Sequence, residues 1–303
     1  MTKQKKWEEY SEKDILEANI EKYNKEAIVK FYEDLEEPKY LYSEYKVIFN
    51  SVAKMLQTSC SGPIRAVDMC GGAGKAAFVL KECSPACTVN LVDVSDKMLE
   101  IAQNKAQKQN ITGIIPSQKD AFAFLEQEAE YDLIMFSSAI HHFKDPVNLI
   151  NLAAQRLSDH GLIITIADPT TITKSKRYKF FEFLATNSEG KKHKLKACFS
   201  SKKNNEVAAS MEPDFDLAEY QTYTGIDDIA LRQSLTATGL NPLLHIRYPA
   251  GEPYMTKIMP YLGLCWAFSM VISKNVINEY EMQKDAIKQE IKANMPFKFR
   301  FMS

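Results

Sequence analysis

A short turn with three glycines separates an apolar run from a helix-compatible segment, at Asp68-Met69-Cys70-Gly71-Gly72-Ala73-Gly74. Glycine-rich backbone between a strand and a helix lets a ligand reach main-chain amides that a side chain would otherwise cover. About twenty residues further on, a second apolar run ends in Asp93. A carboxylate at the end of the second strand of such a unit accepts hydrogen bonds from ribose hydroxyls. Together these residues predict a site for a nucleoside-containing cofactor.

Two other glycine motifs fit this turn poorly. A dinucleotide-binding fingerprint requires Gly-x-Gly-x-x-Gly, which the segment from Gly72 to Ala77 meets only with alanine in the last place. A phosphate-binding loop fails because Met69 stands where its first glycine belongs and Ala76 where its serine or threonine belongs. Packing alone can also place small residues at a strand–helix turn, so the turn by itself is weak evidence.

Three further residues could move a proton during a reaction. His141 and His142 follow another apolar run, and an imidazole titrates near neutral pH, so either could take a proton from a hydroxyl or an amine. The alternative for both is that they only shape the floor of a pocket. Asp168, after the fifth apolar run, is either a second candidate base or a turn residue before Pro169.

The glycine turn resembles motif I of the class I methyltransferases, which use S-adenosylmethionine and whose motif reads Asp-x-Gly-x-Gly-x-Gly. Cys70 departs from it at the first glycine, although the turn is similar to the Asp-Leu-Ala-Gly-Gly-Thr-Gly of the ubiquinone/menaquinone-type small-molecule methyltransferases. The resemblance covers about Ile64 to Pro169, with further motifs in order at Val92–Leu99, Lys119–Ala121, Tyr131–Phe136, Ile140–Phe143, Asp145-Pro146 and Arg156–Ile164.

The resemblance implies S-adenosylmethionine as cofactor, S-adenosylhomocysteine as product, and a role for individual residues. Asp93 would bind the ribose, unless it is a surface carboxylate; Asp68 would organise the turn and orient the methionine end, or cap the following helix. Asp120 would meet the adenine amino group or start a helix, and Met98 would pack on the adenine or in the core. The predicted cofactor-binding residues are Asp68, Cys70, Gly71, Gly72, Gly74, Asp93, Val94, Met98, Asp120, Ala121 and Ser137, and the candidate catalytic residues are His141, which the resemblance places nearer the cofactor, His142 and Asp168.

Strand-like and helix-like segments alternate through the middle of the chain, which predicts an α/β fold: a doubly wound, mostly parallel sheet with helices on both faces. The family resemblance implies seven strands, the last antiparallel and near Leu264–Ser273. Ligands bind such sheets at the carboxyl ends of the strands, where the chain order reverses. The first five strands are predicted near Ile64–Met69, Thr88–Asp93, Ile111–Pro116, Tyr131–Phe136 and Leu162–Ala167, and one amphipathic helix is predicted from Glu12 to about Asp34.

Five parts are predicted along the chain: an N-terminal helical cap at 1–60, a cofactor-binding core at 61–170, an inserted lid after the fifth strand at 171–224, the rest of the core at 225–275 with a loop insertion at 250–263, and a C-terminal helix and tail at 276–303. The lid is first basic, with ten Lys or Arg from Lys174 to Lys203, and then acidic. The basic run is a solvated helix face, a lid that attracts an anionic substrate, or a contact for nucleic acid or lipid headgroups.

Composition narrows the class of protein. A net charge of −1 argues against a dedicated nucleic-acid binder, and no apolar run is long enough to span a membrane. No signal peptide is recognised, so we expect a cytoplasmic protein whose six cysteines are reduced. We expect no metal, because Cys83 and Cys87 have no second pair at zinc spacing and only Asp168 fits a magnesium-dependent pattern.

The sequence therefore favours an enzyme that transfers a methyl group to a small molecule, anionic or aromatic, held under a lid. That lid would comprise the N-terminal helices, Lys174–Tyr223 and Tyr254–Tyr261. Transfer would depend on alignment and exclusion of water, with a histidine or aspartate as possible base. Two alternatives remain open: a regulatory protein that binds S-adenosylmethionine without turnover, and a methyltransferase that acts on protein or RNA. The sequence says nothing about the oligomeric state.

Overall fold

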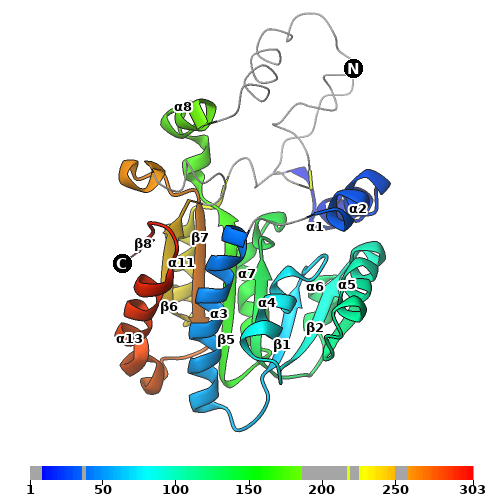
Figure 1. Ribbon diagram of the computed structural model, residues 1–303, viewed down its shortest axis with the longest axis horizontal. Helices are drawn as coiled ribbons and strands as arrows, with labels where there is room; N and C mark the ends of the chain where they lie inside the picture. The colour runs from blue at the N-terminus through cyan, green and yellow to red at the C-terminus, as the bar shows by residue number, and fades with distance from the viewer. Residues whose placement is uncertain (1–8, 36–38, 186–216, 219–224, 250–257, 303) are drawn as a thin grey trace, which may run out of the picture.

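The computed structural model describes residues 9–35, 39–185, 217–218, 225–249 and 258–302. Within these residues one twisted sheet forms the centre of the molecule, with helices on both faces (Figure 1). Its strand order is β3-β2-β1-β4-β5-β7-β6-β8. The strands are β1 (Arg65–Met69), β2 (Thr88–Asp93), β3 (Ile114–Gln118), β4 (Tyr131–Ser137), β5 (Leu157–Pro169), β6 (Asn241–Tyr248), β7 (Ala267–Ser273) and β8 (Arg300–Phe301).

The first five strands run parallel to one another, whereas β7 is antiparallel to both of its neighbours, β5 and β6. The chain order reverses between β1 and β4, because the chain moves outward to β2 and β3 and then returns to β4. Loops after β1 and β4 therefore leave in opposite directions and open a crevice at the carboxyl ends of these strands. The predicted α/β architecture is confirmed.

The sheet has eight strands in the described part of the chain, not the seven expected. The additional strand, β8, contains two residues and pairs with β6 through Ile246–Phe301 and Arg247–Arg300. Two residues leave no alternating pattern in a sequence, so this strand forms only because the edge of β6 offers unpaired backbone groups.

The helices cover both faces of the sheet and bury two large apolar clusters. Helices α3, α4, α5 and α13 lie on one face, and α6, α7 and α11 on the other. Their bounds, with those of α1, α2 and α8, are α1 (Glu12–Tyr23), α2 (Glu26–Glu33), α3 (Lys39–Ser59), α4 (Lys75–Cys83), α5 (Asp96–Lys108), α6 (Ala121–Leu125), α7 (Pro146–Ala154), α8 (Lys176–Ala185), α11 (Asp228–Ala237) and α13 (Asn278–Asn294).

The N-terminal segment forms two helices, where the sequence predicts one. The helix α1 ends at Tyr23 and is capped by Asn24, and Lys25 takes an extended conformation before α2 begins. Neither residue is a glycine or a proline, so the amphipathic spacing carries no sign of the break. The break is tied to tertiary contact, because the Ser95 hydroxyl donates a hydrogen bond to the Asn24 side chain at 2.6 Å.

The bounds of β3 and β5 also differ from expectation, and β7 starts at Ala267, three residues after the predicted start of the last strand. β3 starts at Ile114 because Gly113, with φ of +82°, turns the chain just before it. Pro116 lies inside β3, which is tolerated because β3 is an edge strand that pairs with β2 alone. β5 extends from Leu157 to Pro169 and is interrupted by a register shift between Thr165 and Asp168.

Most of the predicted inserted lid at 171–224 lies outside the described residues, as does most of the loop insertion at 250–263. Within the described part, α8 follows β5, and residues 259–262 form a short 3-10 helix. Tyr178 of α8 packs against Met259 and Leu264. The domain boundaries themselves remain predictions. No helix in the described ranges is long and apolar enough to cross a membrane.

Candidate active site

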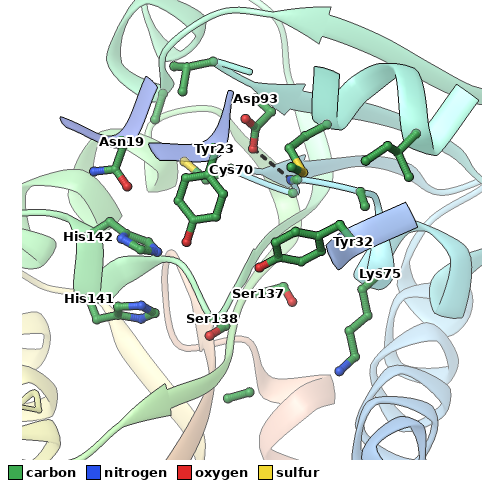
Figure 2. Close-up of a pocket in the computed structure, with 18 of the residues that line it drawn as sticks. Asn19, Tyr23, Tyr32, Cys70, Lys75, Asp93, Ser137, Ser138, His141 and His142 are labelled. Atoms are coloured by element: carbon green, nitrogen blue, oxygen red, sulfur yellow. Dashed lines mark hydrogen bonds between the residues drawn. The ribbon is translucent and has the colours of Figure 1, made fainter. Parts of the chain in front are cut away.

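A cavity of about 1160 Å³ opens at the carboxyl ends of the parallel strands. Its walls come from the loops after β1, β2, β4 and β5 and from α1, α2 and α5 (Figure 2). Eleven of the predicted site residues line it: Cys70, Gly71, Gly72, Asp93, Val94, Met98, Asp120, Ala121, Ser137, His141 and His142. The other three, Asp68, Gly74 and Asp168, lie behind this wall and are fully buried.

The turn after β1 and the end of β2 are joined by one carboxylate. The backbone amide of Gly72 donates a hydrogen bond to Asp93 Oδ2 at 2.8 Å, and the amide of Ser95 donates to Oδ1 at 2.8 Å. Burial raises the pKa of Asp93, although these amide hydrogen bonds act against that shift. A Cβ atom on Gly72 would point into open space, so the turn exposes bare backbone beside the carboxylate.

Asp68 organises the turn from behind and does not line the cavity. The strand period places it on the same face as Ala66, toward α4, where its Oδ2 accepts a hydrogen bond from the Ala77 amide at 2.9 Å. Gly71 is required beside it, because a Cβ there would lie 2.6 Å from Asp68 Cγ. Burial raises the pKa of Asp68 to about 7. This contact with the first turn of α4 is what the capping alternative expects, and the role of Asp68 toward the methionine end of the cofactor remains a prediction.

Cys70 replaces a family glycine at a position that still has a glycine-like conformation. Its φ is +54°, in the left-handed region that side chains rarely adopt. The turn nevertheless keeps its hydrogen bonds, including the one from the Gly71 amide to the Val92 carbonyl at 3.0 Å. Burial, with the nearby Asp93, Asp68 and Asp120, raises the pKa of the Cys70 thiol well above its usual value.

The wall beyond Asp93 is formed by Val94, Met98, Asp120 and Ala121. Met98, on α5, lines the cavity and has only 1% of its surface exposed. Asp120 caps α6, because its Oδ1 accepts hydrogen bonds from the amides of Phe122 and Ala123, both at 3.0 Å. The helix-start reading of Asp120 is therefore correct, and the same residue also reaches the cavity.

The opposite wall contains the two histidines. His141 Nδ1 lies 2.9 Å from Asp168 Oδ1, and the same oxygen accepts a hydrogen bond from the His141 amide at 3.3 Å. His142 packs on His141 with 4.1 Å between ring centroids, and its Nδ1 donates to the Ala218 carbonyl at 2.5 Å. Figure 2 shows both imidazole rings directed into the pocket from the side opposite Lys75.

Asp168 is placed under His141 by an irregularity in β5. Ala167 has φ of +63°, and its amide donates a hydrogen bond to the Tyr248 hydroxyl at 3.0 Å. This bulge coincides with the register shift and directs Asp168 inward. Burial raises the pKa of Asp168 to about 8. Asp168 thus contacts His141 and not the cavity, so it is placed to orient the imidazole.

Several lining residues were not identified as site residues from the sequence. Tyr23 and Tyr32 cover the pocket from α1 and α2 (Figure 2), a segment that the sequence assigned to the lid without singling out these two residues. Lys75 follows the glycine turn directly and reaches the cavity, and its position next to the motif was the available signal. Ser138, with φ of +51°, and Trp266 gave no signal, because only the folded chain brings them to this edge.

The sequence matches a family model described as "Methyltransferase domain" over residues 62–220. The chain belongs to this methyltransferase family. The matched residues contain the glycine turn, Asp93, Asp120 and both histidines, which form the walls of the cavity. The prediction of a class I methyltransferase is confirmed in family and fold, while the resemblance to the ubiquinone/menaquinone type remains a prediction.

Solved structures of methyltransferases share this fold. The chain is similar to the plantazolicin methyltransferase BpumL in complex with SAH, with a TM-score of 0.52 and 14% identity over 88% of this chain and 96% of that chain. It is also similar to magnesium protoporphyrin IX methyltransferase (ChlM) from Synechocystis PCC 6803 with bound SAH, with a TM-score of 0.50 and 13% identity over 86% and 99%. At these identities the likeness concerns the fold.

The sequence predicts that the site binds no metal. In the described ranges, no group of three or more His, Cys, Asp or Glu side chains is arranged to hold a metal ion. Metal-independent transfer is still a prediction of the sequence.

Proposed function

We propose that this methyltransferase transfers a methyl group from S-adenosylmethionine to a small-molecule acceptor. The observation that carries the proposal is that a single cavity has a ribose-type carboxylate site, Asp93 joined to the Gly72 amide, on one wall and His141, with Asp168 behind it, on another. The relatives with bound SAH have the same fold, which supports the donor.

The residues of the cavity fit the parts of this donor. Asp93 would accept hydrogen bonds from the two ribose hydroxyls, and the open side of Gly72 gives the methionine chain access to the backbone. Met98, Asp120 and Ala121 would bound the adenine. When bound, S-adenosylmethionine supplies a methyl group on a positively charged sulfur. The protein then has to align the acceptor and keep water away.

His141 is proposed as the general base. A proton on Nδ1, donated toward Asp168, leaves the Nε2 nitrogen in the form that can accept a proton from the acceptor. Asp168 positions the ring in the same way that a buried carboxylate orients a histidine in a catalytic triad. His142, whose Nδ1 donates to the Ala218 carbonyl, would shape the wall beside it.

We propose a small acceptor because helices α1 and α2 cover the mouth of the cavity. Residues 9–35 are the part of the predicted helical cap that contains α1 and α2, and we call this part the N-terminal cap. It crosses the mouth of the cavity and contributes Tyr23 and Tyr32. Aromatic walls on an enclosed site favour a compact, partly apolar acceptor over a folded protein surface. In a cell extract supplied with labelled donor, we expect the label to partition with metabolites. Label in protein or RNA would contradict this proposal, and no transfer at all would favour a regulatory binder.

Donor binding is tested by Asp93→Asn. The amide oxygen can still accept from the Gly72 amide, but the loss of charge should weaken SAH binding about 10- to 100-fold. Isothermal titration calorimetry measures the affinity, and Glu100→Ala, which removes an exposed carboxylate from α5, is the control. Unchanged affinity in Asp93→Asn, with a wild-type melting temperature, would contradict the assignment.

A further inference from the structure

Lys75 places a positive charge inside the cavity at the first residue of α4. Its ammonium lies 4.5 Å from the ring centroid of Tyr45 and 5.6 Å from that of Tyr42, both on α3. These distances are those of cation–π contacts, so two aromatic faces hold the side chain in the pocket. The lysine is only half-buried, which leaves it accessible from the cavity.

Tyr45 connects this charge to the end of β4. Its hydroxyl shares a hydrogen bond of 2.8 Å with the Ser137 hydroxyl, and Ser137 lines the cavity where the chain order reverses. The Lys75 ammonium is therefore close to the end of β4, on the far side of the glycine turn from Asp93. Figure 2 shows the same arrangement, with Lys75 and Ser137 across the pocket from Asp93.

The order of the strands orients the donor along the cavity. From β3 through β2 and β1 to β4 the wall presents Asp120, then Asp93, then the bare turn, and then Ser137. If the adenine and ribose occupy the first two positions, the amino-acid end of the donor extends past the turn toward β4 and α3. That end has a carboxylate, which needs a positively charged partner in a partly enclosed site.

Other lysines along the cavity are less well placed for that carboxylate. Lys13 lies on the cap and pairs with Glu17 at 3.8 Å. Lys105, on α5 beside β2 and β3, lies over the Phe78 ring at 4.4 Å and donates a hydrogen bond to the Tyr42 hydroxyl at 3.5 Å. Lys108, also on α5, is exposed. Among the described lysines of the cavity wall, Lys75 is the one that contacts Tyr45, and Tyr45 in turn contacts Ser137 at the end of β4.

We propose that Lys75 binds the carboxylate of the donor's amino-acid end, held in place by Tyr42 and Tyr45. This inference rests on the proposed function. It predicts that the side-chain charge matters only for ligands that have the amino-acid group. S-Adenosylhomocysteine has this group, whereas 5′-methylthioadenosine has the adenosine and sulfur but lacks it.

The test compares both ligands by calorimetry on wild type, Lys75→Met and Lys75→Arg. We expect Lys75→Met to weaken S-adenosylhomocysteine binding about 10- to 100-fold and to leave 5′-methylthioadenosine binding unchanged. Lys75→Arg should keep most of the affinity. Lys108→Met, which removes an exposed lysine from the same cavity, is the matched control and should change neither affinity.

The outcomes separate this inference from the proposed function. Equal losses for both ligands in Lys75→Met would overturn it, since they would indicate a disturbed pocket. Unchanged S-adenosylhomocysteine binding would also overturn it, because Lys75 would then not bind the carboxylate of the donor. Failure of the wild-type protein to bind either ligand would instead count against the proposed function.

Discussion

The His141–Asp168 pair is the most unusual contact of the pocket at the scale of single residues. Both side chains are buried, and Asp168 has an Oδ2 atom without a hydrogen-bond partner in the described part of the chain. Burial raises the pKa of Asp168 to about 8, so its charge is costly near neutral pH. Asp168 Oδ1 can accept the Nδ1 hydrogen bond in either protonation state of the carboxyl group, most strongly when it is ionised, and a proton on Nδ1 is the state that the proposed base requires.

Asp168→Asn should therefore change the pH dependence of stability. Between about pH 4 and pH 8 the folded wild type retains a proton that the unfolded chain releases, so its free energy of unfolding falls as pH rises through this window. The asparagine variant has no proton to retain at this position. As the pH is raised from 5 to 8, its free energy of unfolding should therefore rise by on the order of 2 to 5 kcal/mol relative to that of wild type. Denaturant titrations at several pH values measure the difference.

Asp159→Asn is the control for this measurement, because Asp159 is an exposed carboxylate of the same strand. We expect its curve to parallel that of wild type. If Asp168→Asn also ran parallel to wild type, then Asp168 would be ionised across the whole range, and the pH dependence argued here would be wrong.

At the scale of elements, the N-terminal cap is fastened at both ends of α1. Glu12 Oε1 accepts hydrogen bonds from the amides of Lys144 at 3.0 Å and Asp145 at 3.2 Å, in the loop after the histidines. At the other end, Asn24 meets Ser95 at the start of α5. The cap thus connects the two walls of the cavity, and its position depends on a few polar contacts instead of a large buried core.

Glu12→Ala should loosen the cap. It removes two hydrogen bonds to a charged acceptor, worth about 1 to 2 kcal/mol together at this partly exposed place. Amide exchange in the cap should become roughly tenfold faster, and SAH binding should weaken severalfold, because Tyr23 and Tyr32 cover the pocket less often. Hydrogen–deuterium exchange read by mass spectrometry measures the first effect and calorimetry the second.

Glu17→Ala provides the comparison, since Glu17 lies on the same helix and pairs at 3.8 Å with the exposed Lys13. Its exchange rates should match those of wild type. A cap that exchanged equally fast in both variants would show that the Glu12 contacts do not hold it in place.

Across the whole molecule, a buried charged cluster joins α11 to β6. Asp228, fully buried at the start of α11, lies 2.7 Å from His245 Nε2 and makes a two-point ion pair with Arg247 at 2.7 and 2.6 Å. Burial raises the pKa of Asp228, but the hydrogen bonds from His245 and Arg247 outweigh it, and the net pKa is lowered. None of the three residues lines the cavity.

Asp228→Ala should destabilise the fold without affecting the donor site. Removing one partner leaves Arg247 with an uncompensated, largely buried charge, which typically costs about 3 to 5 kcal/mol. Thermal and denaturant unfolding measure the loss, and Asp285→Ala, at an exposed position of α13, should stay near wild type. SAH affinity of the folded variant should be unchanged; a large change there would mean that α11 is coupled to the pocket.

Much of the fold and of the pocket wall was readable from local patterns. The bounds of β2 agree with the prediction, because a short apolar run between turns leaves few alternatives. The glycine turn and Asp93 were also recognisable, since close approach of backbone to a ligand demands small residues at fixed spacing. The break at Asn24 and the two-residue β8 were not, because both depend on contacts with distant residues.

The sequence by itself determined the family, the alternation of strands and helices, and which strand ends bear the glycines, carboxylates and histidines. Those features follow from residues close together in the chain, where periodicity and turn chemistry act. Only the tertiary structure decided that Asp168 lies beneath His141 and that Lys75 reaches the pocket over Tyr45. Each of these depends on segments distant in sequence, whose meeting is set by the packing of the whole sheet and not by any local pattern.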